Sequence, residues 1–565
     1  MERGRHAIGV DELLGLRNAA VHLRVGIFRV GGVEAENRVP EAGGGVGEKH
    51  HSRREYQCRP GGRRTSLRTG RGAGGRRSLT GHSSTHHVQL ERRYTLQLSR
   101  IFRDNGPVYT LVGTPPPTNA LLSFSIRNVR SYWEEATLSL IGTRLSDAEV
   151  VRGLQVAGIQ GPANVLPTAG LFGANASGKS AFLRAMADMR AVVLSSFRKG
   201  DQETKLPRQP FLLHDHGAEQ PSRFEIDLIL HGVRWQYGFE IDDQSVRDEY
   251  AYYYPKGRQA LVFRRERDDR TPSFGPAFRS SGRVLARLVR RNALLLSVVG
   301  AVADGPVNAR SSVTTLIGPL FDWFRDNLRL MAPDNRGAGI AKTAELLPHP
   351  KARGAIVPLL QAADLGIKDI ERIVIDAEAA EKWQRALRGL DGLEEEPAGA
   401  QDEYFLRSNL LRLSHAGTEG AVSVDPEHES QGTLAWVSLL GPLLETIRRG
   451  SVLLLDELDS SLHPHLVRRF IRLFHDPKTN PWCAQLVFNA HDPTILGDSS
   501  QRTLGRDQIW LTEKNVDGGT TLYSLAEFQP KRDEALGKRY LQGRYGAVPV
   551  LDPAEFQLLA DADGS

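Results

Sequence analysis

The sequence predicts an α/β fold, and two observations carry that prediction. Residues 169–172, 451–455 and 485–489 are short apolar runs of the length expected for strands buried on both faces of a parallel sheet. Helical patterns at residues 181–189 and 434–449 adjoin the first two runs. Short apolar strands that alternate with helices indicate a sheet whose strands run parallel.

An antiparallel β subdomain is also expected. Residues 121–129 alternate apolar and polar side chains as a half-buried strand does, and residues 137–141 are their expected antiparallel partner. Two hairpins are predicted further along, at 224–230 with 233–241 and at 249–254 with 259–263. Four tyrosines in the second hairpin (Tyr250, Tyr252, Tyr253 and Tyr254) suit either base stacking or sheet packing. We adopt packing, the commoner role of aromatic residues in a strand.

The N-terminal segment, residues 1–119, differs in composition from the rest of the chain. The 565 residues carry a net charge of +6, but this segment holds 20 basic and 10 acidic residues, so the remainder carries −4. Its 19 glycines and 19 arginines give no apolar period, which predicts disorder. Only Met1 precedes Met186, so a second interpretation is that the segment is not normally translated. We favour these two over a flexible Arg/Gly arm that binds nucleic acid.

The domain prediction for the rest of the chain is one folded domain at 120–552 and a tail at 553–565. Within the domain, the pattern from about 278 to 400 turns helical and predicts a helical insertion that ends near an acidic linker at Glu394. The insertion lacks the sustained heptads of a long coiled coil. Only 74 residues follow His491, and a nuclease domain in this part of the chain would need more residues and a cluster of acidic metal ligands. We therefore expect no nuclease domain after His491. Residues 538–549 are expected to pack against the domain rather than to dock a partner.

Several classes of protein are excluded. No window reaches about 18 consecutive apolar residues, so no membrane-spanning helix is expected. The first residues lack the apolar core and cleavage site of a secretory signal. Cys58 and Cys483 cannot form a disulfide framework or a zinc site by themselves. A cytoplasmic protein without a membrane partner is predicted.

A phosphate-binding loop follows the first apolar run. The eight residues from Gly173 to Ser180 fit the pattern G-x-x-x-x-G-K-[ST], with Asn175 and Gly178 inside it. Glycines let main-chain N–H groups point at phosphates, and the N-terminus of the following helix adds positive potential. Lys179 is the expected partner of the β- and γ-phosphates of ATP, and the Ser180 hydroxyl is an expected ligand of Mg²⁺.

Polar residues at the ends of the other two runs supply the rest of the predicted site. Asp456 and Glu457 follow the run at 451–455, and we assign Asp456 to the metal and Glu457 to the attacking water. His491 follows the run at 485–489 and is positioned to reach a γ-phosphate. Upstream, Ser430 and Gly432 form a helix cap that presents a hydroxyl and N–H groups to an anion.

In this order, the motifs resemble those of the ABC-type ATPases, the class that contains SMC and RecF-like proteins. Within that class the chain is similar to prokaryotic AAA family ATPases often found in phage-defence and abortive-infection systems. The stretches that carry the resemblance are residues 121–132, 173–180, 208–213, 429–436, 452–464, 488–496, 506–514 and 538–549. The resemblance therefore implies a P-loop NTPase of ABC-ATPase type.

The resemblance also implies roles for individual residues. Ser430 and Gly432 would lie in a signature loop that contacts the nucleotide of a partner subunit, Ser460 and Ser461 in a loop that faces that subunit, and His491 at the switch position. Gln209 is the candidate for the glutamine loop, with Gln202 as the alternative. The signature here is Ser-Gln-Gly-Thr, which differs from that of transporters and argues against a transporter subunit.

The motifs predict an enzyme that hydrolyses ATP, and the resemblance implies that it does so at a composite site in a homodimer or higher homo-oligomer. Its closure would gate a separate effector, a nuclease or a toxin, in prokaryotic defence. The alternative is a SMC/RecF-like DNA-maintenance ATPase, for which nucleic acid would be the partner. A third interpretation, a ring-forming AAA+ unfoldase, would require an arginine finger and a hexamer. The Ser-Gly helix cap that precedes the carboxylates argues against that class.

Overall fold

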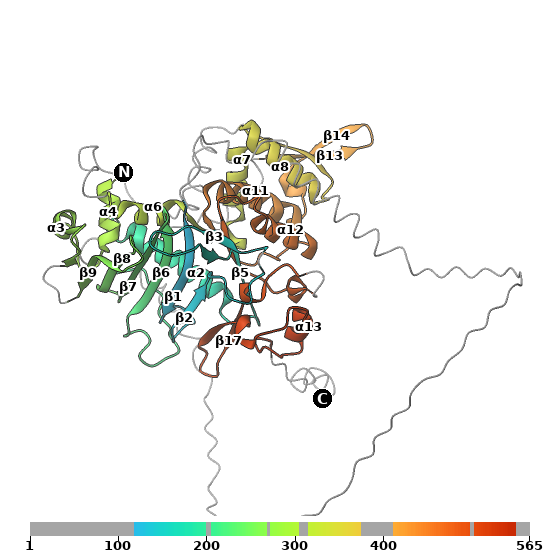
Figure 1. Cartoon of the computed structure of the whole chain (residues 1–565). Helices are drawn as coiled ribbons and strands as arrows, with labels where there is room; N and C mark the ends of the chain where they lie inside the picture. Colours follow the sequence, from blue (N-terminus) through green and yellow to red (C-terminus); the bar gives the residue numbers. More distant parts are fainter. Residues whose placement is uncertain are drawn as a thin grey trace, which may run out of the picture. The chain divides into compact units, whose positions relative to one another are not determined.

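The computed structural model describes residues 118–147, 149–198, 205–267, 272–303, 315–373, 411–497 and 502–549 (Figure 1). The predicted N-terminal segment lies outside these ranges except for its last two residues, and so do the acidic linker near Glu394, Gln202 and the tail 553–565. Among the helices that are described, none is long and apolar enough to cross a membrane.

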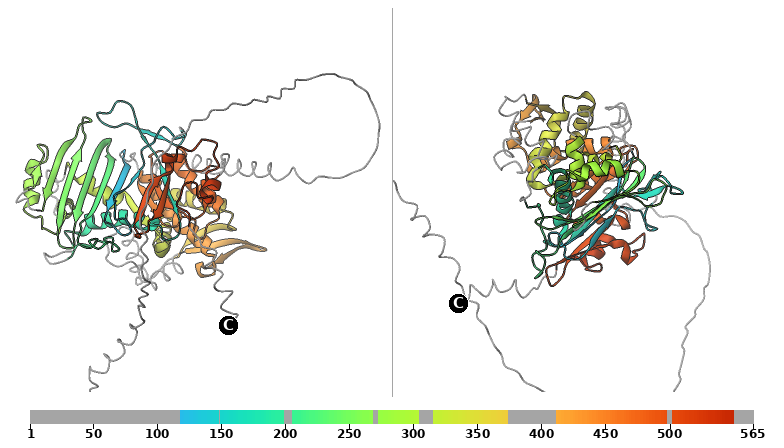
Figure 2. Two further views of the ribbon diagram at one scale, coloured as in Figure 1. Left: turned by 90° about the horizontal axis from the view of Figure 1, so that it is seen from below. Right: turned by 90° about the vertical axis from the view of Figure 1, so that its left-hand side faces the viewer.

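A seven-stranded antiparallel sheet forms the first part of the fold (Figure 2). Its order is β10-β9-β8-β7-β6-β1-β2. The predicted strand at 121–129, its partner and both predicted hairpins are confirmed as neighbouring antiparallel strands. The strands are β1 (Ala120–Arg127), β2 (Ala136–Ser139), β6 (Ser222–Leu230), β7 (Val233–Ile241), β8 (Val246–Tyr253), β9 (Ala260–Glu266) and β10 (Ser273–Phe274).

A six-stranded sheet of order β11-β15-β16-β5-β17-β18 forms the second part, which confirms the α/β class. All of its pairs are parallel except β17 with β18. The three apolar runs of the sequence are its β5, β15 and β16, whose residues are all buried, as expected for strands covered on both faces. The strands are β5 (Thr168–Gly173), β11 (Leu328–Met331), β15 (Val452–Leu455), β16 (Gln485–Asn489), β17 (Ile509–Lys514) and β18 (Thr520–Ser524).

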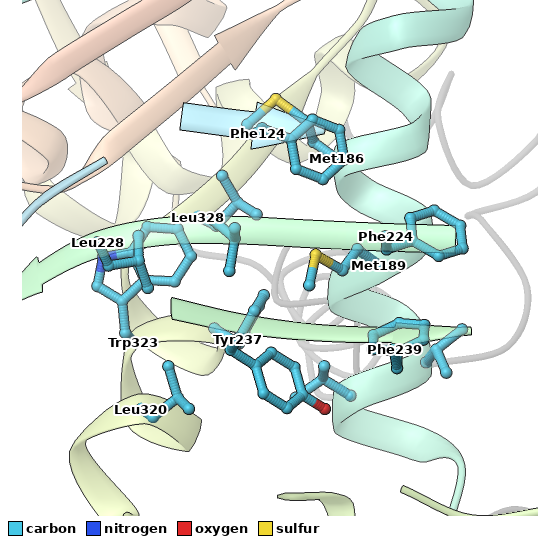
Figure 3. Close-up of a cluster of buried hydrophobic side chains, with 14 of the residues drawn as sticks. Phe124, Met186, Met189, Phe224, Leu228, Tyr237, Phe239, Leu320, Trp323 and Leu328 are labelled. Carbon is cyan, nitrogen blue, oxygen red and sulfur yellow. The ribbon is translucent and has the colours of Figure 1, made fainter. Parts of the chain in front are cut away.

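The helix α2 (Lys179–Ser195) packs in a core shared by the two sheets (Figure 3). Its Phe182, Met186 and Met189 are fully buried, and the Phe182 ring meets Phe124 of β1 edge-to-face at 5.5 Å between centroids. Each such side chain stabilises the fold by about 1.5–3 kcal/mol relative to an exposed one. The helix that starts at the phosphate loop is therefore held firmly by apolar packing.

The helix α11 (Gln431–Arg449) belongs to a second core, which also includes side chains of β5, β15 and β16. It crosses α7 (Arg336–Leu346) closely, because a Cβ at Gly441 would lie 2.5 Å from the main-chain N of Thr343. Glycine is thus required at this crossing. Residues 538–549 pack here as predicted, since Tyr540, Tyr545 and Ala547 are buried in the same core.

The region expected to be a helical insertion, about 278–400, differs from that prediction where the structure describes it. It contains helices, but β11 is the edge strand of the parallel sheet and β12 (Ile367–Arg372) belongs to a separate three-stranded sheet. A four-residue run such as β11 carries no periodic signal, and only its pairing with β15 makes it a strand. Part of this region therefore completes the central sheet.

The described residues form further helices, short strands and 3₁₀ turns. The other described helices are α3 (Arg279–Ala286), α4 (Leu295–Ala303), α6 (Gly318–Asp326), α8 (Pro350–Ala362), α12 (Pro464–His475) and α13 (Leu536–Leu541). The other strands are β3 (Arg152–Leu154), β4 (Ala163–Val165), β13 (Leu411–Gly417) and β14 (Gly420–Val424). The 3₁₀ turns are η4 (Pro333–Asn335), η5 (Pro426–His428), η6 (Pro493–Leu496), η7 (Arg506–Gln508) and η8 (Leu525–Phe528).

Candidate nucleotide-binding site

A cavity of about 810 Å³ lies at the carboxyl ends of β5, β15 and β16. Ligand sites in α/β sheets commonly form at this edge, where loops leave the strand ends. Residues predicted from three separate motifs meet in this cavity. The lining includes Asn175, Gly178, Lys179, Ser180, Glu457 and His491 from those predictions, together with Ser131 and Asp459.

The glycines of the phosphate loop are required by its conformation. Gly178 has a φ of +106°, and a Cβ there would lie 2.4 Å from the Thr520 hydroxyl oxygen. A Cβ at Gly173 would lie 2.4 Å from the main-chain oxygen of Thr512. The loop passes directly into α2, whose first N–H groups and helix dipole favour an anion at this end.

Lys179 is buried and lies over the loop that precedes it. Its Nζ donates to the main-chain oxygens of Gly173 and Ala174, both at 2.8 Å. Burial lowers the pKa of Lys179 to about 8, although the carboxylates of Asp459, Asp456 and Glu457 oppose the shift. Among the described residues no carboxylate forms an ion pair with this ammonium group, and phosphate oxygens would stabilise its charged form.

Asn489 connects the two expected metal ligands, and the sequence prediction missed it. Its fully buried Nδ2 donates to Ser180 Oγ at 3.1 Å and to Asp456 Oδ1 at 2.6 Å. Its Oδ1 accepts a hydrogen bond from the main-chain N–H of Glu457. The signal in the sequence was a polar residue at the end of an apolar strand. A hydroxyl and a carboxylate that share one amide group present the hard oxygen donors that Mg²⁺ prefers, so these residues fit that ion.

The loop after the carboxylates is constrained at several points. Glu457 has a φ of +55° and Ser461 a φ of +68°, a left-handed conformation that costs a non-glycine residue about 1–3 kcal/mol. The Asp459 carboxylate accepts hydrogen bonds from the main-chain N–H groups of His491, at 2.8 Å, and Asp492, at 2.7 Å. These bonds hold the His491 loop beside Glu457 at the cavity.

Arg184 is a second residue that the prediction missed. It lies one turn along α2 from Ser180, on the same face of the helix. Its Nε lies 3.6 Å from Asp456 Oδ2, and its Nη2 lies 3.3 Å from Asp334 Oδ2. Arg184 thereby links the predicted metal ligand to the turn that precedes α7.

Five of the predicted residues are not part of the cavity lining. Gly173 and Asp456 contact or adjoin the lining residues Lys179 and Glu457, whereas Ser430, Gly432 and Gln209 do not. Ser430 is the exposed N-cap of α11, and its hydroxyl accepts the Thr433 N–H at 3.1 Å, as the sequence predicts for a helix cap. Gly432 lies beside the main-chain oxygen of Ser461 and does not line the cavity. Gln209 is exposed; its main-chain oxygen accepts the N–H of Arg130, and its side chain is not part of the lining.

One family of known proteins matches most of the described part of the chain. Residues 169–497, more than half of the chain, match the family described as "AAA domain, putative AbiEii toxin, Type IV TA system". No curated protein matches the chain significantly.

Two solved structures are similar to this chain at low identity. One is the SMC head domain from Thermotoga maritima, at 12% identity, with 72% of this chain and 98% of that chain covered and a TM-score of 0.32. The other is the Smc head domain with an extended coiled coil bound to the C-terminal domain of ScpA, derived from Pyrococcus furiosus. For that structure the identity is 12%, the coverage 73% and 98%, and the TM-score 0.29.

Proposed function

Because this chain belongs to the family of AAA domains described as putative AbiEii toxins of type IV toxin–antitoxin systems, we propose that it binds ATP and hydrolyses it to ADP and phosphate. The observation that carries the proposal is that Lys179, Ser180 and Glu457 line one cavity, while the buried Asn489 joins Ser180 to Asp456 by hydrogen bonds. A cytoplasmic location is part of the proposal.

Each residue has a distinct role in this proposal. Lys179 and the N–H groups of the phosphate loop bind the β- and γ-phosphates. Ser180 and Asp456 hold Mg²⁺, which when bound neutralises phosphate charge. Glu457 orients the attacking water and accepts its proton, while His491 contacts the γ-phosphate. Asn489 fixes the positions of Ser180, Asp456 and the Glu457 main chain relative to one another.

A second copy of the chain completes the proposed site. Ser430 and Gly432 stand at the N-terminus of a 19-residue helix, a favourable place for an anion, yet neither residue lines the cavity of its own chain. Two copies facing each other would bring this cap of one copy to the γ-phosphate bound by the other. We propose that such closure gates a separate effector, a nuclease or a toxin, in prokaryotic defence.

DNA maintenance is the alternative function, and we do not adopt it. Residues 120–565 carry a net charge of −4, which supplies no general attraction to a polyanion. The test measures ATP hydrolysis by a chain that starts at residue 118, with and without DNA. If DNA stimulates hydrolysis and the stimulation falls steeply with salt, DNA maintenance becomes the preferred function.

The test of the proposal uses Glu457→Gln, which removes the proton acceptor and leaves the phosphate and metal ligands in place. We expect hydrolysis to fall by at least ~100-fold, the usual contribution of a general base. We also expect ATP to convert the variant to a dimer, as measured by size-exclusion chromatography with light scattering.

Two matched variants serve as controls for dimer formation. Adding Lys179→Ala to Glu457→Gln should abolish the ATP-dependent dimer, because the phosphates lose their cation. Adding Ser430→Arg should abolish it while leaving ATP binding intact. A monomeric Glu457→Gln protein that still hydrolyses ATP would contradict both the assigned role of Glu457 and the two-copy site.

A further inference from the structure

A second cavity, of about 1030 Å³, lies away from the proposed nucleotide site. We call it the arginine cavity because its walls contain Arg469, Arg472, Arg502, Arg506 and Arg532. His475 also lines it and contacts Thr168, the first residue of β5, with its Nε2 2.7 Å from the threonine Oγ1. The phosphate loop begins at the last residue of β5, so the two cavities lie at opposite ends of one strand, about 17 Å apart.

Within the described part of the chain, Arg502 and Arg506 form no ion pair with a carboxylate. The Nη2 of Arg502 donates to the main-chain oxygen of Glu534 at 2.9 Å. Arg506 donates from Nη1 to the Pro530 oxygen at 3.0 Å and from Nη2 to the Leu145 oxygen at 2.8 Å. These carbonyl oxygens orient the two half-buried guanidinium groups, but they carry no formal charge that would neutralise them.

The positive charges also act on each other. Burial lowers the pKa of Arg502, and the nearby cations Arg506 and Arg532 lower it further, while Asp147 and Tyr545 oppose the shift. Like charges held together at a partly buried place are costly unless an anion joins them. A bound anion would therefore be stabilised by both guanidinium groups at once.

The walls indicate a small ligand rather than a long polyanion. Four carboxylates line the cavity as well, of which Asp147 lies 3.7 Å from the Arg532 Nε and Asp476 accepts the main-chain N–H of Lys478. The lining side chains therefore carry a net charge of only +1, and Arg502 and Arg506 are the arginines held by main-chain carbonyl oxygens. The described lining contains no phenylalanine, tyrosine or tryptophan, so no ring is available for stacking on bases.

We propose that the arginine cavity binds a small ligand through its phosphate groups, with Arg502 and Arg506 as the principal contacts. The planar guanidinium presents two parallel N–H donors that match the spacing of phosphate oxygens. The ligand class is a compound with a free phosphate or diphosphate group, recognised independently of any base. This binding site is separate from the proposed ATP site and does not depend on hydrolysis there.

The experiment measures binding of inorganic pyrophosphate to the full chain by isothermal titration calorimetry. The phosphate loop is expected to bind this probe too, so the wild-type protein should bind two molecules per chain and Lys179→Ala only one. In the Lys179→Ala background, Arg502→Gln with Arg506→Gln should weaken the remaining binding at least ~10-fold, since two charge-assisted contacts are lost. Loss of all binding on Lys179→Ala alone would overturn the proposal.

Two controls separate a site from a general charge effect or a folding defect. Arg353→Gln with Arg412→Gln makes the same change in net charge at arginines that pair with carboxylates elsewhere, and it should leave pyrophosphate binding unchanged. Arg532→Gln alters a largely exposed side chain at the rim and should weaken binding several-fold without affecting the urea midpoint. Equal weakening by the control pair would overturn the proposal.

A competition experiment distinguishes a small phosphate compound from a nucleic-acid backbone as the source of the bound phosphate groups. We expect pyrophosphate to bind Lys179→Ala more tightly than a 12-nucleotide single-stranded DNA does, and the DNA not to displace it. DNA that binds more tightly and displaces pyrophosphate would overturn the proposal of a small ligand in favour of a nucleic-acid backbone.

Discussion

Replacing Asn489 by leucine should destabilise the protein and misplace the predicted metal ligands. Leucine has the same branching at Cγ and the same number of side-chain heavy atoms as asparagine, so the main change is the loss of polar contacts. The lost contacts are the hydrogen bonds to Asp456 at 2.6 Å and to Ser180 at 3.1 Å, and the acceptor for the Glu457 N–H. All three involve a side chain with no exposed surface.

The size of the effect follows from these contacts. The bond to the Asp456 carboxylate is charge-assisted and worth about 1.5–3 kcal/mol, and the bond to Ser180 contributes about 0.5–1.5 kcal/mol. An unsatisfied Glu457 N–H adds about 1 kcal/mol. The Arg184 guanidinium, 3.6 Å from Asp456, remains as an ion-pair partner of that carboxylate and limits the loss. We expect the free energy of unfolding to fall by about 3–5 kcal/mol.

Urea denaturation followed by tryptophan fluorescence, in EDTA and without nucleotide, measures this loss. Asn489→Asp is the matched control, because it keeps the shape and the acceptor for Glu457 but places a second carboxylate against Asp456. Both variants should be destabilised without metal, and millimolar Mg²⁺ should restore the aspartate variant alone, since only it gains an oxygen ligand. A loss below about 1 kcal/mol for Asn489→Leu, or rescue of both variants by Mg²⁺, would refute the reasoning.

Three further predictions concern separate parts of the chain. Burial lowers the pKa of Lys179 to about 8, so the free protein loses this positive charge as the pH rises through 8. ATP affinity should therefore fall up to tenfold per pH unit above that value, and ATP binding at pH 8.5 should take up a proton. An ATP affinity that stays constant from pH 7 to 9.5 would contradict this prediction. Glu249→Gln should lower the free energy of unfolding by about 3–5 kcal/mol, because it leaves the buried Arg265, 3.1 Å from the carboxylate, without its counter-charge. Thermal and urea unfolding measure this loss of stability, and an unchanged midpoint would exclude a structural role for the pair. Removing residues 1–117 should leave ATP hydrolysis unchanged. Removing residues 1–119 should lower the free energy of unfolding by about 1–2 kcal/mol, because Asn119 and Thr118 accept hydrogen bonds from N–H groups of the β6–β7 turn. Loss of hydrolysis in the 1–117 deletion would show that the N-terminal segment contributes to the site.

Much of the proposed site could be predicted from the sequence because its motifs are local. The phosphate loop is a run of eight residues whose glycines, lysine and serine act through the backbone they share. The Asp456–Glu457 pair is likewise recognisable, because a buried strand leads directly into two carboxylates. In the same way, the period-two pattern of β1 and the turn between β6 and β7 predicted the antiparallel sheet.

Asn489, Arg184 and β11 could not be predicted, because their roles depend on neighbours distant in sequence. Asn489 lies 309 residues from Ser180, and they meet only because β16 is inserted between β15 and β5 in the sheet. Tertiary packing also decides that Ser430 lies outside the cavity of its own chain and that five arginines from separate segments line the second cavity. The sequence alone therefore determined the chemistry at each strand end. The tertiary structure decided which ends meet, because the order of parallel strands depends on long-range packing that no local pattern records.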